Sequence, residues 1–331
     1  MKLHRRRILQ LAGAAAGLPF VTSITRAQTY PTRPVRFIVP LAAGGGNDFV
    51  ARLTADYLSR SLGQQFIVEN KVGAGGLLGI ETVARSLPDG YTVLVTADAI
   101  VSTPHIVTFN VDIVTFNVDY VRTLLPVSHL VRSPQTISVH PSLGVSTLAE
   151  LIDLAKRRPG IGYATSGAGT NQNFLGEWFA QAAGIKLDHI PYRGAGQAIN
   201  DLIAGHVPMA VLGPAAVIPH HRAGTIRIIA QSSAARSTTL PDVPTIEEAG
   251  LKGVVLETWL AAFAPEKTPA AIIARLSGEM HKAMLDASVA EKLAPTAYEP
   301  VGGSADELAV LVRDDSTKYE RLARELNIKL N

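Results

Sequence analysis

The chain has 331 residues, a hydrophobic content of 47% and a formal net charge of +3. It contains no cysteine, which excludes disulfides, a thiolate nucleophile and a thiolate metal site. A chain of this length and apolar content can form an ordinary core, and it more often folds as two domains than as one.

Residues 1–27 have the pattern of a cleaved export signal. Arg5–Arg7 provide a basic start and Ile8–Ile24 is mostly apolar. An uncleaved membrane anchor is the alternative, but Pro19 interrupts the run, which is shorter than the ~20 residues that span a bilayer. We expect a periplasmic protein that begins at Gln28. The arginines resemble a twin-arginine signal, and the ordinary secretion route stays open.

The basic excess of the chain lies in this N-terminal segment. Residues 1–27 hold five of the 31 basic residues and no acidic one, which leaves 26 basic against 28 acidic residues and a balance of −2. The mature chain therefore gives no reason to expect binding to nucleic acid or to a membrane surface.

Short strand-like runs alternate with helical runs along much of the mature chain. Runs rich in β-branched residues predict strands at Val35–Val39, Phe66–Glu69, Thr92–Thr96, Thr136–Val139, Ile161–Ala164, Met209–Leu212 and Ile226–Ala230. Apolar residues three or four positions apart predict helices at Phe49–Leu62, Gly79–Ser86, Thr147–Arg157, Asn173–Ala183, Gln197–Ala204 and Val217–Ala223. This alternation is typical of an α/β fold with two mostly parallel sheets flanked by helices, in which ligands bind beyond the carboxyl ends of the strands.

The C-terminal part of the chain is mainly helical. Its apolar pattern predicts helices at Ala270–Ala287 and Ser304–Glu325. Earlier in the chain, Ile106–Asp112 and Ile113–Asp119 are identical heptapeptides, which indicates a slip duplication. We expect this duplication to lengthen a surface loop or hairpin, because loops tolerate insertion.

Glycine-rich loops connect several predicted strands to helices. The pattern occurs in Val35–Leu58 and Ile161–Gly184, and in a shorter form in His189–Gly205. Glycine lets the backbone approach a ligand closely, and the free N–H groups of a helix N-terminus favour negative charge. Several such loops in one chain predict an anionic ligand that is held from two sides.

The sequence motifs argue against an enzymatic function. Gly73–Gly76 and Gly194–Gly196 resemble dinucleotide loops, but neither completes the G-x-G-x-x-G pattern. The chain also lacks a G-x-S-x-G elbow and an H-E-x-x-H zinc motif, and His220–His221 is a weak metal candidate at a helix end. We therefore expect a binding protein without a cofactor, a metal or catalytic residues.

An ordered set of segments matches the sequence pattern of a known protein family: Tyr30–Arg36, Pro40–Asp48, Val68–Asn70, Gly73–Gly76, Pro88–Thr92, Tyr163–Gly169, Pro191–Gly196 and Leu240–Gly250. Through these segments the chain resembles the solute-binding proteins of tripartite tricarboxylate transporters, the Bug or TctC family. The resemblance implies a two-lobed periplasmic binding protein of type II that closes like a Venus flytrap on a small carboxylate.

The resemblance also implies how the chain is divided into lobes and which partners the protein has. The first lobe is expected to comprise residues 28–128 and 254–331, and the second residues 129–253, with the ligand cleft between them. The expected partners are a small organic acid and the membrane permease subunits of a tripartite transporter, and the protein is expected to be a monomer. A receptor that signals to a membrane sensor kinase is the alternative.

The resemblance further implies a set of ligand contacts. Carried over by position, they are Ala42, Gly44, Gly45, Asn47, Asp48, Thr96 and Asp98 in the first lobe, and Ser166, Gly167, Gly169, Thr170, Asn171, Asn173, Gly194 and Ala195 in the second. Ala43, Asn47, Asn173 and Leu212 stand where the family usually has proline, threonine, histidine and an acidic residue, which bears on ligand identity.

Structural roles remain open for some of these positions. Asp48 could serve only as a helix cap, and Asp98 could be an ordinary turn aspartate. Arg193 is more simply explained as a solvated side chain, and Gly73–Gly79 as a close strand-to-helix contact.

Overall fold

The computed structural model describes residues 30–73, 76–106 and 123–328. The predicted export signal lies outside these residues, as does all but the first residue of the duplicated segment Ile106–Asp119.

One half of the fold is built on a six-stranded sheet. Its order is β11 (Glu299–Gly303), β4 (Leu124–Pro134), β10 (Glu257–Pro265), β3 (Thr92–Ala97), β1 (Val35–Val39) and β2 (Phe66–Asn70). Strands β1, β2 and β3 pair in parallel, whereas β10 runs antiparallel to both of its neighbours and β11 antiparallel to β4.

The other half is built on a five-stranded sheet. Its order is β7 (Leu187–Pro191), β6 (Ile161–Thr165), β8 (Met209–Leu212), β5 (Thr136–Val139) and β9 (Arg227–Gln231). Strand β6 pairs in parallel with β7 and β8, and β5 pairs antiparallel with β8 and β9. The sequence predicts mostly parallel sheets, but both sheets are mixed. They are mixed because the chain passes twice between them.

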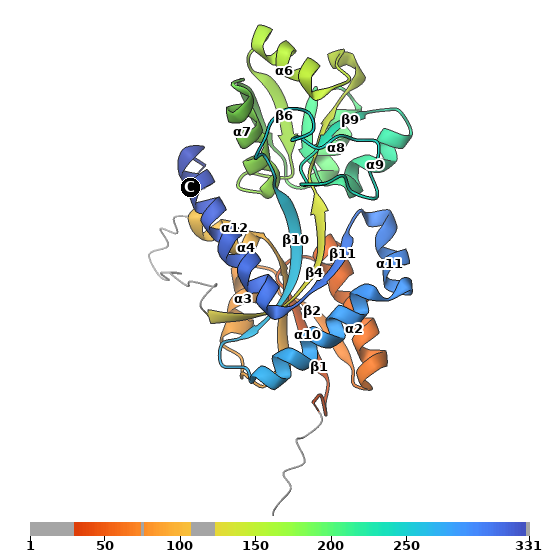
Figure 1. The fold of residues 1–331 in the computed structure, drawn as a ribbon, viewed down its shortest axis with the longest axis vertical. Helices are drawn as coiled ribbons and strands as arrows, with labels where there is room; N and C mark the ends of the chain where they lie inside the picture. The colour runs from red at the N-terminus through yellow and green to blue at the C-terminus, as the bar shows by residue number, and fades with distance from the viewer. Residues whose placement is uncertain (1–29, 74–75, 107–122, 329–331) are drawn as a thin grey trace, which may run out of the picture.

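Helices cover both sheets (Figure 1). The first sheet carries α2 (Gly46–Leu62), α3 (Leu77–Ala84), α10 (Ala270–Leu285), α11 (Ala287–Leu293) and α12 (Ala305–Glu325), with the short α4 (Ala99–Ser102) after β3. The second sheet carries α6 (Leu148–Arg157), α7 (Asn171–Ala183), α8 (Ala195–Ile203) and α9 (Pro214–Arg222).

Alternation along β1 explains the layers of the first half. Phe37 and Val39 point into a core shared with α2 and α10, whereas Ile38 points into a core shared with α3. Helix α2 ends at Leu62, and its C-cap residue Gly63 has a left-handed φ of 67°, which suits glycine. Successive residues of one strand therefore pack against helices on opposite faces of the sheet.

Two long strands, β4 and β10, run from one half of the molecule toward the other (Figure 1). The two segments where the chain passes between the halves, after β4 and before β10, are called the crossings, and a single buried serine links them. Ser232 accepts a hydrogen bond from the N–H of Gln135 at 2.9 Å, and it donates to the carbonyl of Leu256 at 2.5 Å. The backbones of these residues exchange further hydrogen bonds with Ser232.

The C-terminal helix α12 contacts both halves. It packs against β4 and α4, and its Tyr319 ring lies 5.0 Å from the Phe174 ring of α7. Both rings are fully buried. Among the described residues, none of the helices combines the length and the apolar character needed to cross a bilayer.

Candidate functional site

A cleft of about 360 Å³ lies between the two halves. Its lining comes from both sheets and from the two crossings: Leu41, Asn47, Ala97, Ser133, Gln135, Ser166, Gln172, Ala195, Gly213, Pro214, Ala215, Ala216, Thr258, Leu260, Thr296 and Tyr298. None of these described residues carries a formal charge. Any charge on a ligand must therefore be met by neutral hydrogen-bonding groups and by helix ends.

Three helices begin at or beside this cleft without a side-chain cap. The N-cap residues of α2, α8 and α9 are Gly45, Gly194 and Gly213, and no side chain caps any of these helices. Uncapped N-termini leave backbone N–H groups free and carry partial positive charge. The convergence of three such ends makes the cleft favourable for an anion.

Asp48 holds the loop before α2 in place. Its carboxylate accepts hydrogen bonds from the Gly44 N–H at 2.9 Å, the Asn70 amide at 3.0 Å and the Arg52 Nε at 3.0 Å. The Arg52 guanidinium, together with these N–H donors, lowers the pKa of Asp48 to about 2. Asp48 thus fixes the backbone that precedes α2, and Gly44, with a φ of 85°, needs its glycine there.

Tyr298 closes the cleft over the first turn of α2. A Cβ at Gly46 would collide with the Tyr298 ring, so the glycine leaves room for the tyrosine. Burial raises the pKa of Tyr298 to about 12, and the hydroxyl therefore stays protonated at neutral pH. A protonated hydroxyl can donate or accept a hydrogen bond at this edge of the cleft.

The loop before α7 uses its polar groups within the protein. Thr170 caps α7 by accepting from the Asn173 N–H and donates to the Gly167 carbonyl at 2.7 Å. Asn173 accepts in turn from the Gly169 N–H at 3.0 Å. Within this loop only Ser166 lines the cleft, and its N–H donates to Gln172.

Asp98 and Asn171 form part of a buried junction between the halves. Asp98 accepts hydrogen bonds from Asn171 and Tyr319, both at 2.8 Å, and from Thr258 at 2.9 Å. Burial raises the pKa of the Asp98 carboxyl, and the three donors oppose that shift. The carboxylate is therefore satisfied inside the protein, behind the cleft residue Thr258.

The structure brings some of the predicted contacts together and separates others. Asn47, Ser166 and Ala195 line the cleft, with Gly45 and Gly194 at the adjoining helix starts. Thr96 lines a small cavity of about 40 Å³ that shares Asn47 with the cleft. The other predicted positions do not line the cleft: Ala42, Gly44, Asp48, Asp98, Gly167, Gly169, Thr170, Asn171 and Asn173.

Sequence reasoning missed the α9 end of the cleft. Gly213–Ala216 follow β8 directly, and a strand followed by glycine and then proline at the first helical position is a recognisable helix start. Gln135 and Tyr298 carry no comparable local signal, because only the fold brings them beside the glycine loops.

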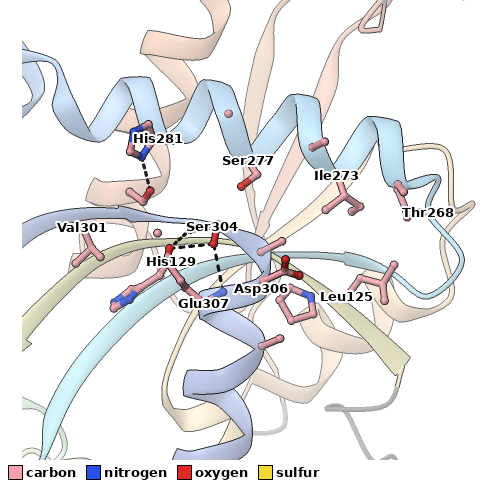
Figure 2. Close-up of a pocket in the computed structure, with 18 residues that line it drawn as sticks. Leu125, His129, Thr268, Ile273, Ser277, His281, Val301, Ser304, Asp306 and Glu307 are labelled. Carbon is pink, nitrogen blue, oxygen red and sulfur yellow. Dashed lines mark hydrogen bonds between the residues drawn. The ribbon is translucent and has the colours of Figure 1, made fainter.

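A larger hollow of about 1180 Å³ lies elsewhere, between α10 and the start of α12 (Figure 2). Its walls are mostly apolar. Among its polar groups, His281 bonds to the Gly302 carbonyl at 2.7 Å and Ser304 and Glu307 cap α12, whereas the His129 Nε2 has no partner. The predicted site residues are absent from its described lining.

Comparisons with known proteins agree with a binding protein. Residues 50–328 match the family described as tripartite tricarboxylate transporter family receptor, TctC. Protein BugT of Bordetella pertussis is 33% identical over 329 residues, which cover 99% of this chain and all of the relative.

Solved structures show the same fold. The R. palustris protein Rpa4515 with adipate is 32% identical, with a TM-score of 0.79, over 91% of this chain and 99% of that one. MatC from Rhodopseudomonas palustris with bound malate is 26% identical, with a TM-score of 0.71, over 88% and 99%.

These relatives are solute-binding proteins and not enzymes, and their two-lobed α/β architecture is that of type II periplasmic binding proteins. The chain belongs to the Bug/TctC family of tripartite tricarboxylate transporter receptors.

Proposed function

We propose that this protein is a receptor that closes its cleft on a small carboxylate-bearing metabolite and delivers it to a tripartite permease. The observation that carries the proposal is the convergence of three uncapped helix N-termini on a cleft without charged lining residues. A carboxylate there would accept hydrogen bonds from backbone N–H groups, directly or through ordered water. The relatives solved with adipate and malate support the same ligand class.

The contacts in this proposal fall into two groups. Asn47, Ser166, Gly194, Ala195 and the α9 start face the ligand, and the remaining predicted residues hold the loops that present them. Thus Asp48 and Thr170 form hydrogen bonds with the backbone of the two glycine loops, whereas Asp98 and Asn171 form a hydrogen bond between the halves.

The first test is ligand binding by the mature chain, Gln28–Asn331, measured by thermal shift and calorimetry against carboxylates, amino acids and neutral analogues. A ligand present at one hundred times its dissociation constant raises the free energy of unfolding by about 2.7 kcal/mol. We expect stabilisation by carboxylates and none by their neutral amide or ester counterparts that lack any carboxylate.

A matched pair of variants locates the site. Ala195→Asp places a carboxylate at the first residue of α8 in the cleft, and Ala270→Asp does the same at α10, outside it. Both changes suit a helix N-terminus and should leave folding intact. We expect Ala195→Asp to abolish carboxylate binding and Ala270→Asp to retain it. Equal affinity in the two variants would remove this cleft as the site.

Delivery to a permease requires a separate test in cells. We expect deletion of the gene to abolish uptake of the ligand that the purified protein binds. If uptake persists and only ligand-dependent gene induction is lost, the receptor signals to a sensor instead.

Mass spectrometry of the periplasmic protein should find Gln28 at its N-terminus if residues 1–27 are removed on export.

A further inference from the structure

Two buried carboxamides in the cleft have polar atoms without a partner. Asn47 is 8% exposed and its Nδ2 makes no hydrogen bond; Gln135 is 3% exposed and its Oε1 makes none. Both residues line the same cavity. Because an unpaired polar atom in a closed site is costly, a bound ligand is the natural partner for these side chains.

The chemistry of a carboxamide restricts that ligand. Each side chain offers N–H donors and a carbonyl acceptor, whichever way the amide group is turned. A carboxylate only accepts hydrogen bonds, so it can pair with the Asn47 Nδ2 but must leave the Gln135 Oε1 unpaired. A ligand that satisfies Asn47 and Gln135 fully must also bring an O–H or N–H donor.

That donor is a neutral group and not an ammonium. None of the described residues that line the cleft is acidic, and Asp98, which contacts the lining residue Thr258, already accepts from three side chains. The positive ends of α2, α8 and α9 further oppose a cation. A hydroxyl or a carboxamide supplies a donor without that penalty.

We infer that the ligand is a carboxylate that also bears a neutral hydroxyl or carboxamide group, and that Asn47 and Gln135 select it by completing the hydrogen bonds of their side chains. This inference rests on the proposed carboxylate receptor and names the ligand class within it. Asn47 belongs to the first turn of α2, and Gln135 lies beside Gly213 at the start of α9, so the two side chains act from different elements of the cleft.

The test uses calorimetry with matched carboxylates of four to six carbons that differ only in carrying a methyl, hydroxyl, carboxamide, ammonium or second carboxylate group. We expect the best hydroxyl or carboxamide compound to bind about tenfold tighter, or more, than its methyl and ammonium counterparts. Gln135→Leu and Asn47→Leu keep similar volume and remove both donor and acceptor. Each should reduce this ratio to about twofold, and the ratio is the readout because loss of the side-chain N–H groups can weaken every carboxylate of the series alike.

A second variant covers the case in which a leucine variant does not fold. Gln135→Glu keeps the acceptor, removes the donor and adds negative charge, so it should shift preference toward the ammonium compound. Wild-type ratios retained in every folded variant would overturn the inference, as would a wild-type protein that binds the methyl or ammonium compound most tightly. If no carboxylate of any series binds, the proposed receptor function itself fails.

Discussion

Asp48 illustrates how one carboxylate can serve a binding site without touching a ligand. It is 4% exposed and joins the Gly44 backbone to Arg52 and Asn70. We predict that Asp48→Asn lowers the free energy of unfolding by about 1–3 kcal/mol, because the charge-assisted bonds to Arg52 and Gly44 are weakened. Urea denaturation of the ligand-free protein measures this difference.

The same residue predicts a pH dependence. The folded-state pKa of about 2 lies below the ordinary value of 3.8, so the charged form stabilises the fold. This contribution is complete above pH about 4 and is lost as the pH falls toward 2. The deficit of Asp48→Asn relative to wild type should therefore shrink over that range.

Asp56 provides the control, since it forms an ion pair with Arg60 at the same spacing on the same helix but is 56% exposed. Asp56→Asn should change stability by less than about 0.5 kcal/mol at any pH. Equal deficits in the two variants would show that burial of the Asp48 carboxylate contributes nothing.

At the scale of elements, local pattern predicts some strands well and misses others for physical reasons. The predicted strands Val35–Val39, Thr136–Val139 and Met209–Leu212 have the bounds of β1, β5 and β8. By contrast, residues 260–264 of β10 are all buried, so the strand shows no alternation of polar and apolar residues. β11 reads EPVGG, whose proline and glycines are depleted in strands, and only its pairing with β4 makes it one.

The residues of the candidate site likewise divide into those that local sequence pattern predicts and those that it misses. Glycine loops are visible in the sequence, and they lead to the α2 and α8 ends of the cleft. Partners that are distant in sequence are not visible: Asp98 meets Tyr319 across 221 positions, and Gln135 reaches the cleft only because β4 crosses between the sheets. Chain topology, which local pattern does not encode, decides which of the polar side chains remain available to a ligand.

Ser232 gives a prediction for the pair of crossings. Ser232→Ala removes the acceptor of the Gln135 N–H and the donor to Leu256, both in a fully buried setting. We expect the free energy of unfolding to fall by about 1–3 kcal/mol. The adjacent Ser233→Ala loses one bond of 3.3 Å to Gln231, whose Oε1 keeps the Ser237 N–H, and should cost clearly less. Similar costs in denaturation experiments would argue against a special role for the crossings.

At the scale of the whole molecule, the two sides of the cleft differ in how firmly the halves are joined. On one side, α12 packs against α7 through fully buried rings and the Asp98 junction. On the other, α9 lies against the short helix Ala294–Thr296, which contributes Thr296 to the cleft. Closure on a ligand should therefore pivot near α12 and bring α9 toward the first half.

The absence of cysteine makes this motion measurable, because two introduced cysteines are the only labelling sites. Spin labels at Asp56→Cys in α2 and Arg222→Cys in α9 report the distance across the cleft. Labels at Asp56→Cys and Arg85→Cys report a distance within the first half. All three residues are exposed. We predict that a bound carboxylate shortens the first distance by more than about 2 Å in pulsed dipolar measurements and leaves the second unchanged. A ligand that binds by calorimetry while both distances stay constant would mean that the cleft is preformed and that the receptor signals occupancy without closing.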